Sequence, residues 1–118
     1  MIKIKRIYED PVETDGYRIL IDRLWPRGVT KKRAKIDLWL KEVTPSDKLR
    51  KWYSHDPQKW SEFQNKYKTE LIDKLDSLNQ IKTIEKEQEI VTLLYAAKDE
   101  KLTHAIVLQK ILVNNKKK

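Results

Sequence analysis

Two short stretches of this sequence are apolar on both of the faces that a β-strand presents. Residues 19–21 read Ile-Leu-Ile, and residues 89–97 read EIVTLLYAA. A strand with one wet face alternates apolar and polar residues, whereas a strand covered on both faces is apolar throughout. The chain is therefore expected to place two interior strands, near residues 17–24 and 89–97, in a sheet that is covered on both sides.

An alternating stretch at the start of the chain predicts a further strand with one wet face. Ile2 and Ile4 alternate with Lys3 and Lys5, which is the period of two that a half-buried strand shows. The loop over residues 9–16 is too short for a parallel crossover through a helix. We therefore expect the first two strands to be antiparallel neighbours or not paired at all.

The middle and the end of the chain carry helix signals. Residues 44–47 (Thr-Pro-Ser-Asp) combine a capping residue with a proline in the first turn. Large apolar residues recur at steps of three and four over residues 60–78, which predicts a long helix facing the core, with a shorter helix after Asn79. Thr103 is expected to cap a last helix over residues 105–113.

Strands and helices that intermingle in this order predict a single α/β domain, residues 1–115, with a small mixed sheet covered by helices and a basic tail at residues 116–118. A chain of 118 residues is large enough for one core without staples. It has no apolar window of membrane-spanning length and no signal-peptide pattern. We therefore expect a soluble cytoplasmic protein with no membrane partner.

Composition excludes several kinds of chemistry. The chain has no cysteine and two histidines, which argues against a thiol nucleophile, a disulfide or a metal site. Its two glycines cannot form a Walker loop or a Gly-x-Gly-x-x-Gly turn. We therefore expect no cofactor and no metal, and any bound phosphate must be held by side chains and helix ends.

The net charge of +8 is concentrated in two places. Residues 1–36 hold ten Lys/Arg against five Asp/Glu, residues 116–118 are all lysine, and residues 37–115 are balanced. Between Arg23 and Ile36 there are six cationic side chains and no acid. Such a one-signed patch attracts anions, whether small phosphates, nucleic acid or acidic partners.

The residues that follow the two interior strands are the candidate site. The first strand is followed by Asp22, Arg23, Trp25 and Arg27, and the second by Lys98 and His104. If the two strands are parallel, both groups share one edge of the sheet, where open α/β sheets bind ligands. We interpret the charged cluster as the lining of a pocket.

Each candidate has a plausible role in this pocket. Arg27 lies in a Pro-Arg-Gly turn, where its fork could hold a carboxylate or a phosphate. Arg23 and Lys98 could help to hold the anion. His104, in the first turn of a helix, could act as a neutral proton carrier, and Asp22 is the second candidate catalytic residue.

The same residues also have structural interpretations. Asp22 and Arg23 could form a buried ion pair, and Trp25 could plug the end of the core under the sheet. Strand alternation weakens the first idea, since it places Asp22 on the opposite face from Arg23 and Trp25. His104 is equally typical of a hydrogen-bonded structural histidine, and His55 is expected at the surface.

Three motifs carry a family resemblance. They are GYRILIDRLWPRG (residues 16–28), TPSDKLRKW (44–52), and LLYAAK (93–98) followed by THA (103–105). Over nearly its whole length the chain resembles the YeaO-like family of small bacterial proteins of unknown function. The resemblance adds Arg50 and Tyr95 as candidate ligand-binding residues. Where the family typically has asparagine, this chain has Thr103, which can still cap a helix but lacks an amide that could contact a ligand.

Three functions remain open. The first is a binder of, or an enzyme acting on, a small phosphate- or carboxylate-bearing ligand at the carboxyl edge of the sheet. The second is a nucleic-acid-binding module that uses the basic segment at residues 23–35. The third is a non-catalytic protein that binds a partner, with its charge serving solubility.

Overall fold

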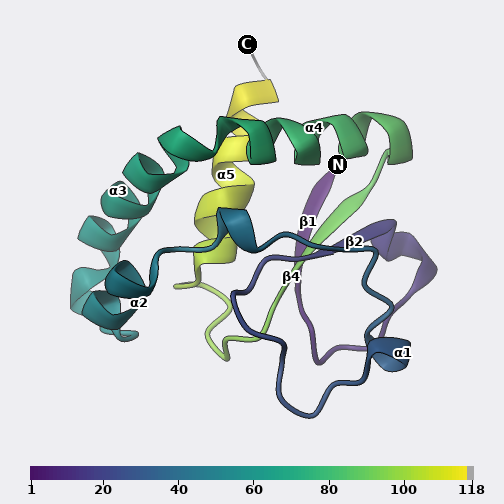
Figure 1. Ribbon diagram of the computed structural model, residues 1–118, viewed down its shortest axis with the longest axis horizontal. Helices are drawn as coiled ribbons and strands as arrows, with labels where there is room; N and C mark the ends of the chain where they lie inside the picture. Colours follow the sequence, from purple (N-terminus) through teal and green to yellow (C-terminus); the bar gives the residue numbers. More distant parts are fainter. Residues whose placement is uncertain (117–118) are drawn as a thin grey trace.

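The computed structural model describes residues 1–116, within which it contains four strands, five α-helices and four short 3₁₀ helices (Figure 1). In chain order they are β1 (Ile2–Arg6), η1 (Glu13–Asp15), β2 (Tyr17–Leu20), α1 (Lys31–Ala34), β3 (Leu38–Trp39), η2 (Lys41–Val43), α2 (Asp47–Tyr53), η3 (Pro57–Lys59), α3 (Trp60–Leu71), η4 (Ile72–Lys74), α4 (Leu75–Gln88), β4 (Val91–Tyr95) and α5 (His104–Lys116). The α/β class is confirmed. Lys117 and Lys118 of the predicted basic tail lie outside the described residues.

The four strands form one parallel sheet in the order β1-β4-β2-β3. The two predicted interior strands are neighbours, since β4 pairs with β2 from Tyr17↔Val91 to Leu20↔Leu94. On its other side, β4 pairs with all of β1. The edge strand β3 has two residues and was not predicted. Every pairing is parallel, so the prediction of a mixed sheet is wrong in this respect.

The connection between β1 and β2 explains why a short loop can join parallel strands. The two strands are not paired with each other, which is one of the two arrangements expected, because β4 lies between them. Residues 7–16 run back along the sheet with only the short 3₁₀ turn η1 and no α-helix, and a segment of ten residues can span up to about 33 Å. The loop ends at Gly16, whose φ is +64° and where an added Cβ would lie 2.3 Å from the carbonyl oxygen of Ile90. Glycine is therefore required at this position.

The sheet separates two apolar clusters. Ile19 and Ile21 belong to the larger one, which lies between the sheet and helices α2 to α5. Leu20 and Leu94 belong to the smaller one, which is covered by α1 and the loops around it (Figure 1). Adjacent residues of β2 thus enter different clusters, as expected for an interior strand.

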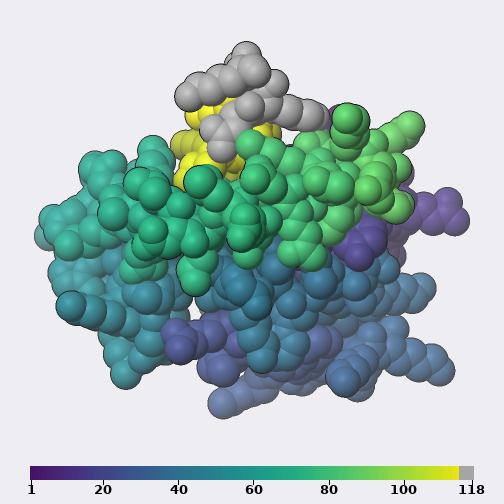
Figure 2. Space-filling view, turned by 45° about the horizontal axis from the view of Figure 1, so that its top comes forward, coloured from purple at the N-terminus to yellow at the C-terminus, as the bar shows by residue number. Residues whose placement is uncertain are grey.

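The predicted long helix over residues 60–78 is broken. It divides into α3 and α4 at the 3₁₀ turn η4, earlier than the predicted end at Asn79. Leu75, expected in the core, is 56% exposed, and Ile72 is 65% exposed. The turn allows α3 to pack against α2 and α5 while α4 crosses the sheet. Figure 2 shows α3 and α4 (teal to green) running above the blue segment that carries β3 and η2.

Candidate functional site

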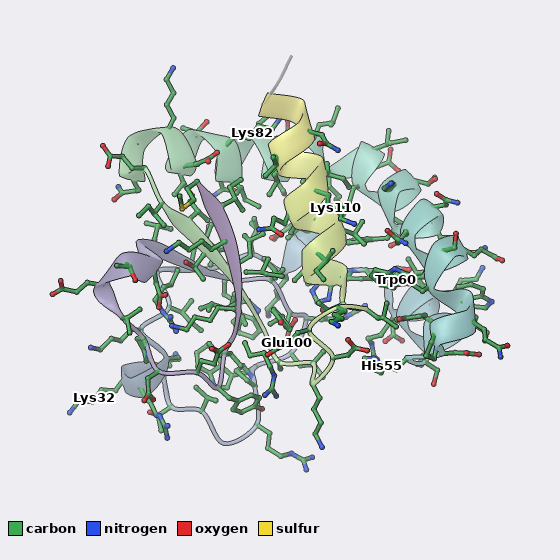
Figure 3. All side chains as sticks on the ribbon, turned by 180° about the vertical axis from the view of Figure 1, so that it is seen from behind. Lys32, His55, Trp60, Lys82, Glu100 and Lys110 are labelled. Carbon is green, nitrogen blue, oxygen red and sulfur yellow. The ribbon has the colours of Figure 1, made fainter. Side chains whose placement is uncertain are left out.

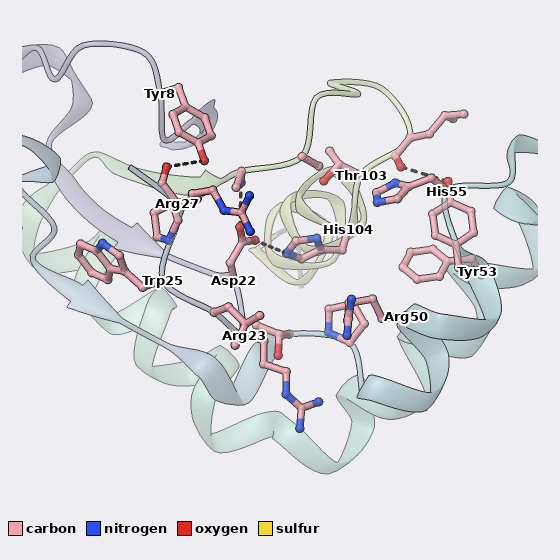
Figure 4. A pocket seen from close by; sticks show the side chains of 18 residues that line it. Tyr8, Asp22, Arg23, Trp25, Arg27, Arg50, Tyr53, His55, Thr103 and His104 are labelled. Carbon is pink, nitrogen blue, oxygen red and sulfur yellow. Dashed lines mark hydrogen bonds and ion pairs between the residues drawn. The ribbon is translucent and has the colours of Figure 1, made fainter. Parts of the chain in front are cut away.

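The loops after β2 and β4 meet the start of α5 at the carboxyl edge of the sheet. The N–H of Ile21 donates to the carbonyl of Leu94 at 3.0 Å, and the N–H of Ala96 donates to the carboxylate of Asp22 at 2.8 Å. His104, the first residue of α5, places Nε2 2.8 Å from the carbonyl oxygen of Ile21. Figure 4 shows these segments around a common centre. The shared edge follows from the parallel pairing of the two strands.

A cavity of about 320 Å³ opens at this edge. That volume is at the lower end of the range for small-molecule pockets, roughly 300–1,000 Å³. The walls come from the loops after β2 and β4, the start of α5, and the segment that leads into α2. Six predicted site residues line the cavity: Asp22, Arg23, Trp25, Arg27, Arg50 and His104.

Arg27 occupies the exposed turn that the sequence predicted. The N–H of Val29 donates to the carbonyl of Pro26 at 3.4 Å, and Gly28 has a φ of +77°. L-residues rarely adopt this backbone conformation, so glycine allows the loop to turn sharply after Arg27. In Figure 4 the side chain of Arg27 extends toward Asp22 and His104.

The other two arginines differ in their surroundings. Arg23 also lines a second, more open hollow of about 560 Å³ beside η2 and η4, and its end points away from Asp22 in Figure 4. Arg50 of α2 donates to Asp47 at 2.7 Å, so part of its charge is already paired. Within residues 1–116, neither Arg23 nor Arg27 has an ion-pair partner.

His104 joins α5 to the end of β2. Because a carbonyl can only accept, Nε2 must carry the hydrogen that is shared with Ile21, and in the neutral ring Nδ1 is then unprotonated. Burial lowers the pKa of His104 below its ordinary value, although the carboxylate of Asp22 acts in the opposite direction. The side chain is 15% exposed, and its ring meets that of Tyr67 edge to face. The imidazole is therefore neutral at pH 7.

Asp22 is held at the cavity without a full cationic partner. Its Oδ2 accepts the N–H of Ala96, and its carbonyl accepts the indole N–H of Trp39 at 2.7 Å. Oδ1 lies 3.4 Å from His104 Nε2. Burial raises the pKa of Asp22, against the opposing influence of His104 and the Ala96 N–H. Among the described residues it forms no ion pair with Arg23, the partner that one structural interpretation assigned to it.

Trp25 has both a structural contact and a place in the cavity wall. Its indole N–H donates to the carbonyl of Val29 at 2.6 Å, and its ring packs edge to face on Trp39 at 5.5 Å. It also packs against the smaller apolar cluster. Trp25 therefore closes one end of that cluster while part of it lines the cavity.

The structure does not bring the last two predicted residues to the cavity. Tyr95 is 2% exposed and lies in the larger apolar cluster, with its pKa raised by burial. Lys98 is exposed in the loop after β4. Neither residue is among the described residues that line the cavity.

Sequence reasoning missed several residues of the cavity wall. Phe63 belongs to the pattern over residues 60–78 that predicted a helix facing the core, and Tyr53 was not singled out. Both are buried, stack at 4.3 Å between ring centroids, and also line the cavity. His55 is exposed, as expected, yet its ring is 5.9 Å from that of Tyr53 and belongs to the lining. For the segment around α2 the sequence had pointed only to Arg50, which the family resemblance marked as a candidate ligand-binding residue and which does line the cavity. Thr103 precedes α5 and accepts the N–H of Ala105 at a long 3.5 Å.

The described part of the chain contains neither a metal-binding cluster nor a membrane-spanning helix. Residues 1–116 contain no group of three or more His, Asp or Glu side chains that could hold a metal ion. No helix formed by those residues combines the length and the apolar character needed to span a membrane.

Comparisons with known proteins find a family and relatives that match almost the whole chain. A family model described as the inactive DUF488-N3 subclade matches residues 1–118. The uncharacterised protein YeaO of Escherichia coli (strain K12) is 42% identical over 107 residues, 91% of this chain and 92% of the relative. Uncharacterised proteins of Mycobacterium tuberculosis (strain H37Rv) and Mycobacterium bovis are each 36% identical over 111 residues, 94% of this chain and 92% of the relative. No solved structure matches the chain.

Proposed function

The chain belongs to the inactive DUF488-N3 subclade and to the YeaO-like family that its motifs predicted, and we propose that it binds a small anionic ligand in this cavity without converting it. The proposal rests on one observation: Arg23 and Arg27 line the cavity and have no ion-pair partner within residues 1–116. A guanidinium group binds a carboxylate or a phosphate through two parallel hydrogen bonds. An anion would therefore supply the partner that the described residues do not.

The charge balance of the lining supports an anionic ligand. Three arginines line the cavity against a single carboxylate, that of Asp22. One oxygen of that carboxylate is already bonded to the N–H of Ala96. A cleft lined mainly by one sign of charge raises the local concentration of the opposite ion.

The apolar part of the lining supports a ligand with an apolar body. Tyr53 and Phe63 form one side of the cavity, and Trp25 and Leu102 contribute further apolar surface. An inorganic anion alone would leave this surface in contact with water, whereas an aromatic carboxylate or phosphate ester would cover it. We therefore expect a ligand that combines an anionic group with a ring or a branched apolar group.

Two observations favour binding over catalysis. The first is that the chain belongs to a subclade known as inactive. In addition, the Nε2 hydrogen of His104 is directed at the carbonyl of Ile21, so this nitrogen cannot accept a proton from a ligand. Catalytic roles for His104 and Asp22 stay predictions. Release of phenol from phenyl phosphate during incubation with the protein, at a rate abolished in His104→Gln, would contradict binding without conversion.

The direct test measures the affinity for two anions with a phenyl ring. We expect isothermal titration calorimetry to detect binding of 3-phenylpropionate and of phenyl phosphate to the wild-type protein. Arg27→Gln should weaken both about tenfold or more, which is the effect of losing a charge-assisted hydrogen bond. The matched control is Lys32→Gln, which removes the same charge from α1, far from the His55 side of the cavity (Figure 3).

The control also distinguishes binding at a specific site from nonspecific attraction of the anion by the net charge. Equal losses in the two variants would mean that net charge alone attracts the anion. The absence of binding by either probe would sink the proposal.

Nucleic acid is the second candidate, favoured by the basic segment at residues 23–35. Of its six cations, only Arg33 forms an ion pair within the described residues, a surface contact with Asp10 at 3.7 Å. Binding to a single-stranded oligonucleotide that collapses with rising salt, and that is lost in a triple variant of Lys31, Lys32 and Arg33, would support this alternative. The same triple variant should leave binding of 3-phenylpropionate unchanged.

A further inference from the structure

We propose that the ligand of this cavity carries, close to its anionic group, an amino or hydroxyl group that donates a hydrogen bond to Oδ1 of Asp22. This inference rests on the proposed function and narrows the ligand to amino or hydroxy acids with an apolar side chain. It follows from the hydrogen bonds around Asp22, from the charges near it, and from the direction of Arg27.

Oδ1 of Asp22 lacks the hydrogen bonds that a carboxylate oxygen can accept. The N–H of Ala96 is bonded to the other oxygen, Oδ2. His104 Nε2 is 3.4 Å from Oδ1 but 2.8 Å from the carbonyl oxygen of Ile21, and its one hydrogen serves the nearer acceptor. Within residues 1–116, Oδ1 receives no hydrogen bond. An ionised carboxylate oxygen can accept several hydrogen bonds, and Oδ1 is not enclosed by the protein, so it is open to a donor that enters the cavity.

The unused oxygen belongs to a side chain that lines the cavity. Asp22 is 17% exposed and is part of the lining. Within residues 1–116 its only charged or titratable neighbour at ion-pair distance is His104, which is neutral. A largely buried carboxylate without a cationic partner gains a charge-assisted hydrogen bond from a ligand ammonium or hydroxyl group.

The position of the anion follows from Arg27. Asp22 and Arg27 lie on the same loop after β2, both line the cavity, and Arg27 extends toward Asp22 in Figure 4. No ion pair joins them, so each remains able to bind a ligand group of its own. A donor and an anion on neighbouring carbons of one molecule would serve both side chains, and its apolar part would face Tyr53 and Phe63.

Three probes with one carbon skeleton test this inference. 3-Phenylpropionate has no donor beside its carboxylate, L-3-phenyllactate has a hydroxyl there, and L-phenylalanine has an ammonium. We expect the wild-type protein to bind L-phenylalanine and L-3-phenyllactate about tenfold more tightly than 3-phenylpropionate. Asp22→Asn should reduce that preference to less than about threefold, and it should not weaken binding of 3-phenylpropionate, because it removes a negative charge from the lining. Arg27→Gln should weaken all three.

The outcomes distinguish this inference from the proposed function. If 3-phenylpropionate binds through Arg27 but the donor brings no gain, the anion site stands and the role of Asp22 falls. If no probe binds, the proposed function falls with it. Should Asp22→Asn not fold, carboxyl ¹³C NMR of the wild-type protein decides: the Asp22 signal should shift with L-phenylalanine and stay in place with 3-phenylpropionate.

Discussion

Two aspartates flank β2, and their surroundings differ in kind. Asp15, before the strand, contacts Lys5 through both carboxylate oxygens at 3.1 Å and Arg18 at 2.6 Å, and it accepts the N–H of Val12. Asp22, after the strand, has the N–H of Ala96 and a long contact with a neutral histidine. One strand thus carries a fully paired acid at its amino end and a partly paired acid at its carboxyl end.

The pKa values of the two carboxyl groups move in opposite directions. Burial would raise the pKa of Asp15, but the N–H of Val12 and the charges of Lys5 and Arg18 outweigh burial and hold it below its ordinary value. At Asp22, burial prevails and the pKa is raised. The acid at the amino edge of the sheet is thus paired with cations, whereas the acid at the carboxyl edge is not, and the proposed function assigns the second to a ligand.

The largest expected difference between the two aspartates is in stability, and the same substitution at both positions measures it. We expect Asp15→Asn to lower the free energy of unfolding by about 3 kcal/mol, because it leaves the buried guanidinium of Arg18 without its counter-charge. Asp22→Asn should change it by less than about 1 kcal/mol, since the charge removed is one that burial already disfavours. Urea unfolding of the two variants measures the difference, and equal losses would show that Asp22 is as structural as Asp15.

The second expected effect is a change in the free energy of unfolding as the pH falls. The folded-state pKa of His104 is lowered, so as pH falls below about 6.5 the unfolded chain takes up a proton that the folded chain resists. The free energy of unfolding should therefore fall with pH in this window, by at most about 1.4 kcal/mol per pH unit. The contribution of Asp22 has the opposite sign, because its raised pKa makes the folded state hold a proton more tightly.

The histidine effect is measured as a difference between two proteins. His104→Gln should remove this part of the slope, because glutamine does not titrate and can still donate to the carbonyl of Ile21. His55→Gln is the matched control and should keep most of the slope, because burial, not the charge of His55, is the main cause that lowers the pKa of His104. An unchanged slope in His104→Gln would mean that His104 does not titrate between the folded and unfolded states as its burial implies.

The smallest expected effect is a change in ligand affinity, and it distinguishes two arginines at the carboxyl edge. Arg50 is already paired with Asp47 at 2.7 Å, whereas Arg27 has no ion-pair partner among the described residues. We therefore expect Arg50→Gln to weaken binding of 3-phenylpropionate by about threefold or less, well below the loss in Arg27→Gln. Calorimetry of both variants ranks the two arginines, and a larger loss at Arg50 would move the anion to the α2 side of the cavity.

The sequence predicted the site where local patterns determine the geometry. Residues 19–21 and 89–97 are apolar on both faces, which placed both strands inside a sheet, and parallel neighbours bring Asp22 and His104 to one edge. The turn at Arg27 followed from a proline and a glycine around one residue. These features depend on backbone chemistry within a few residues of the chain.

Other features depend on contacts between distant segments, which local patterns do not contain. Tyr95 was assigned to the site, but it shares a strand face with Leu93, and both enter the larger cluster. Tyr53 and Phe63 line the cavity only because α2 and α3 fold back beside the start of α5. The break at η4 has neither proline nor glycine, and it follows from the different surfaces on which α3 and α4 pack.

Helix α1, which carries Lys31, Lys32 and Arg33, is only four residues long. A helix of one turn is not stable by itself. Its last carbonyl, that of Ala34, accepts hydrogen bonds from two N–H groups of the buried Arg18, at 3.1 and 2.8 Å. A helix with three adjacent cationic side chains is thus held in place by a buried cation, Arg18. Without these two hydrogen bonds, the charges of Lys31, Lys32 and Arg33 would remain, but they would lose the fixed arrangement that a binding partner could recognise.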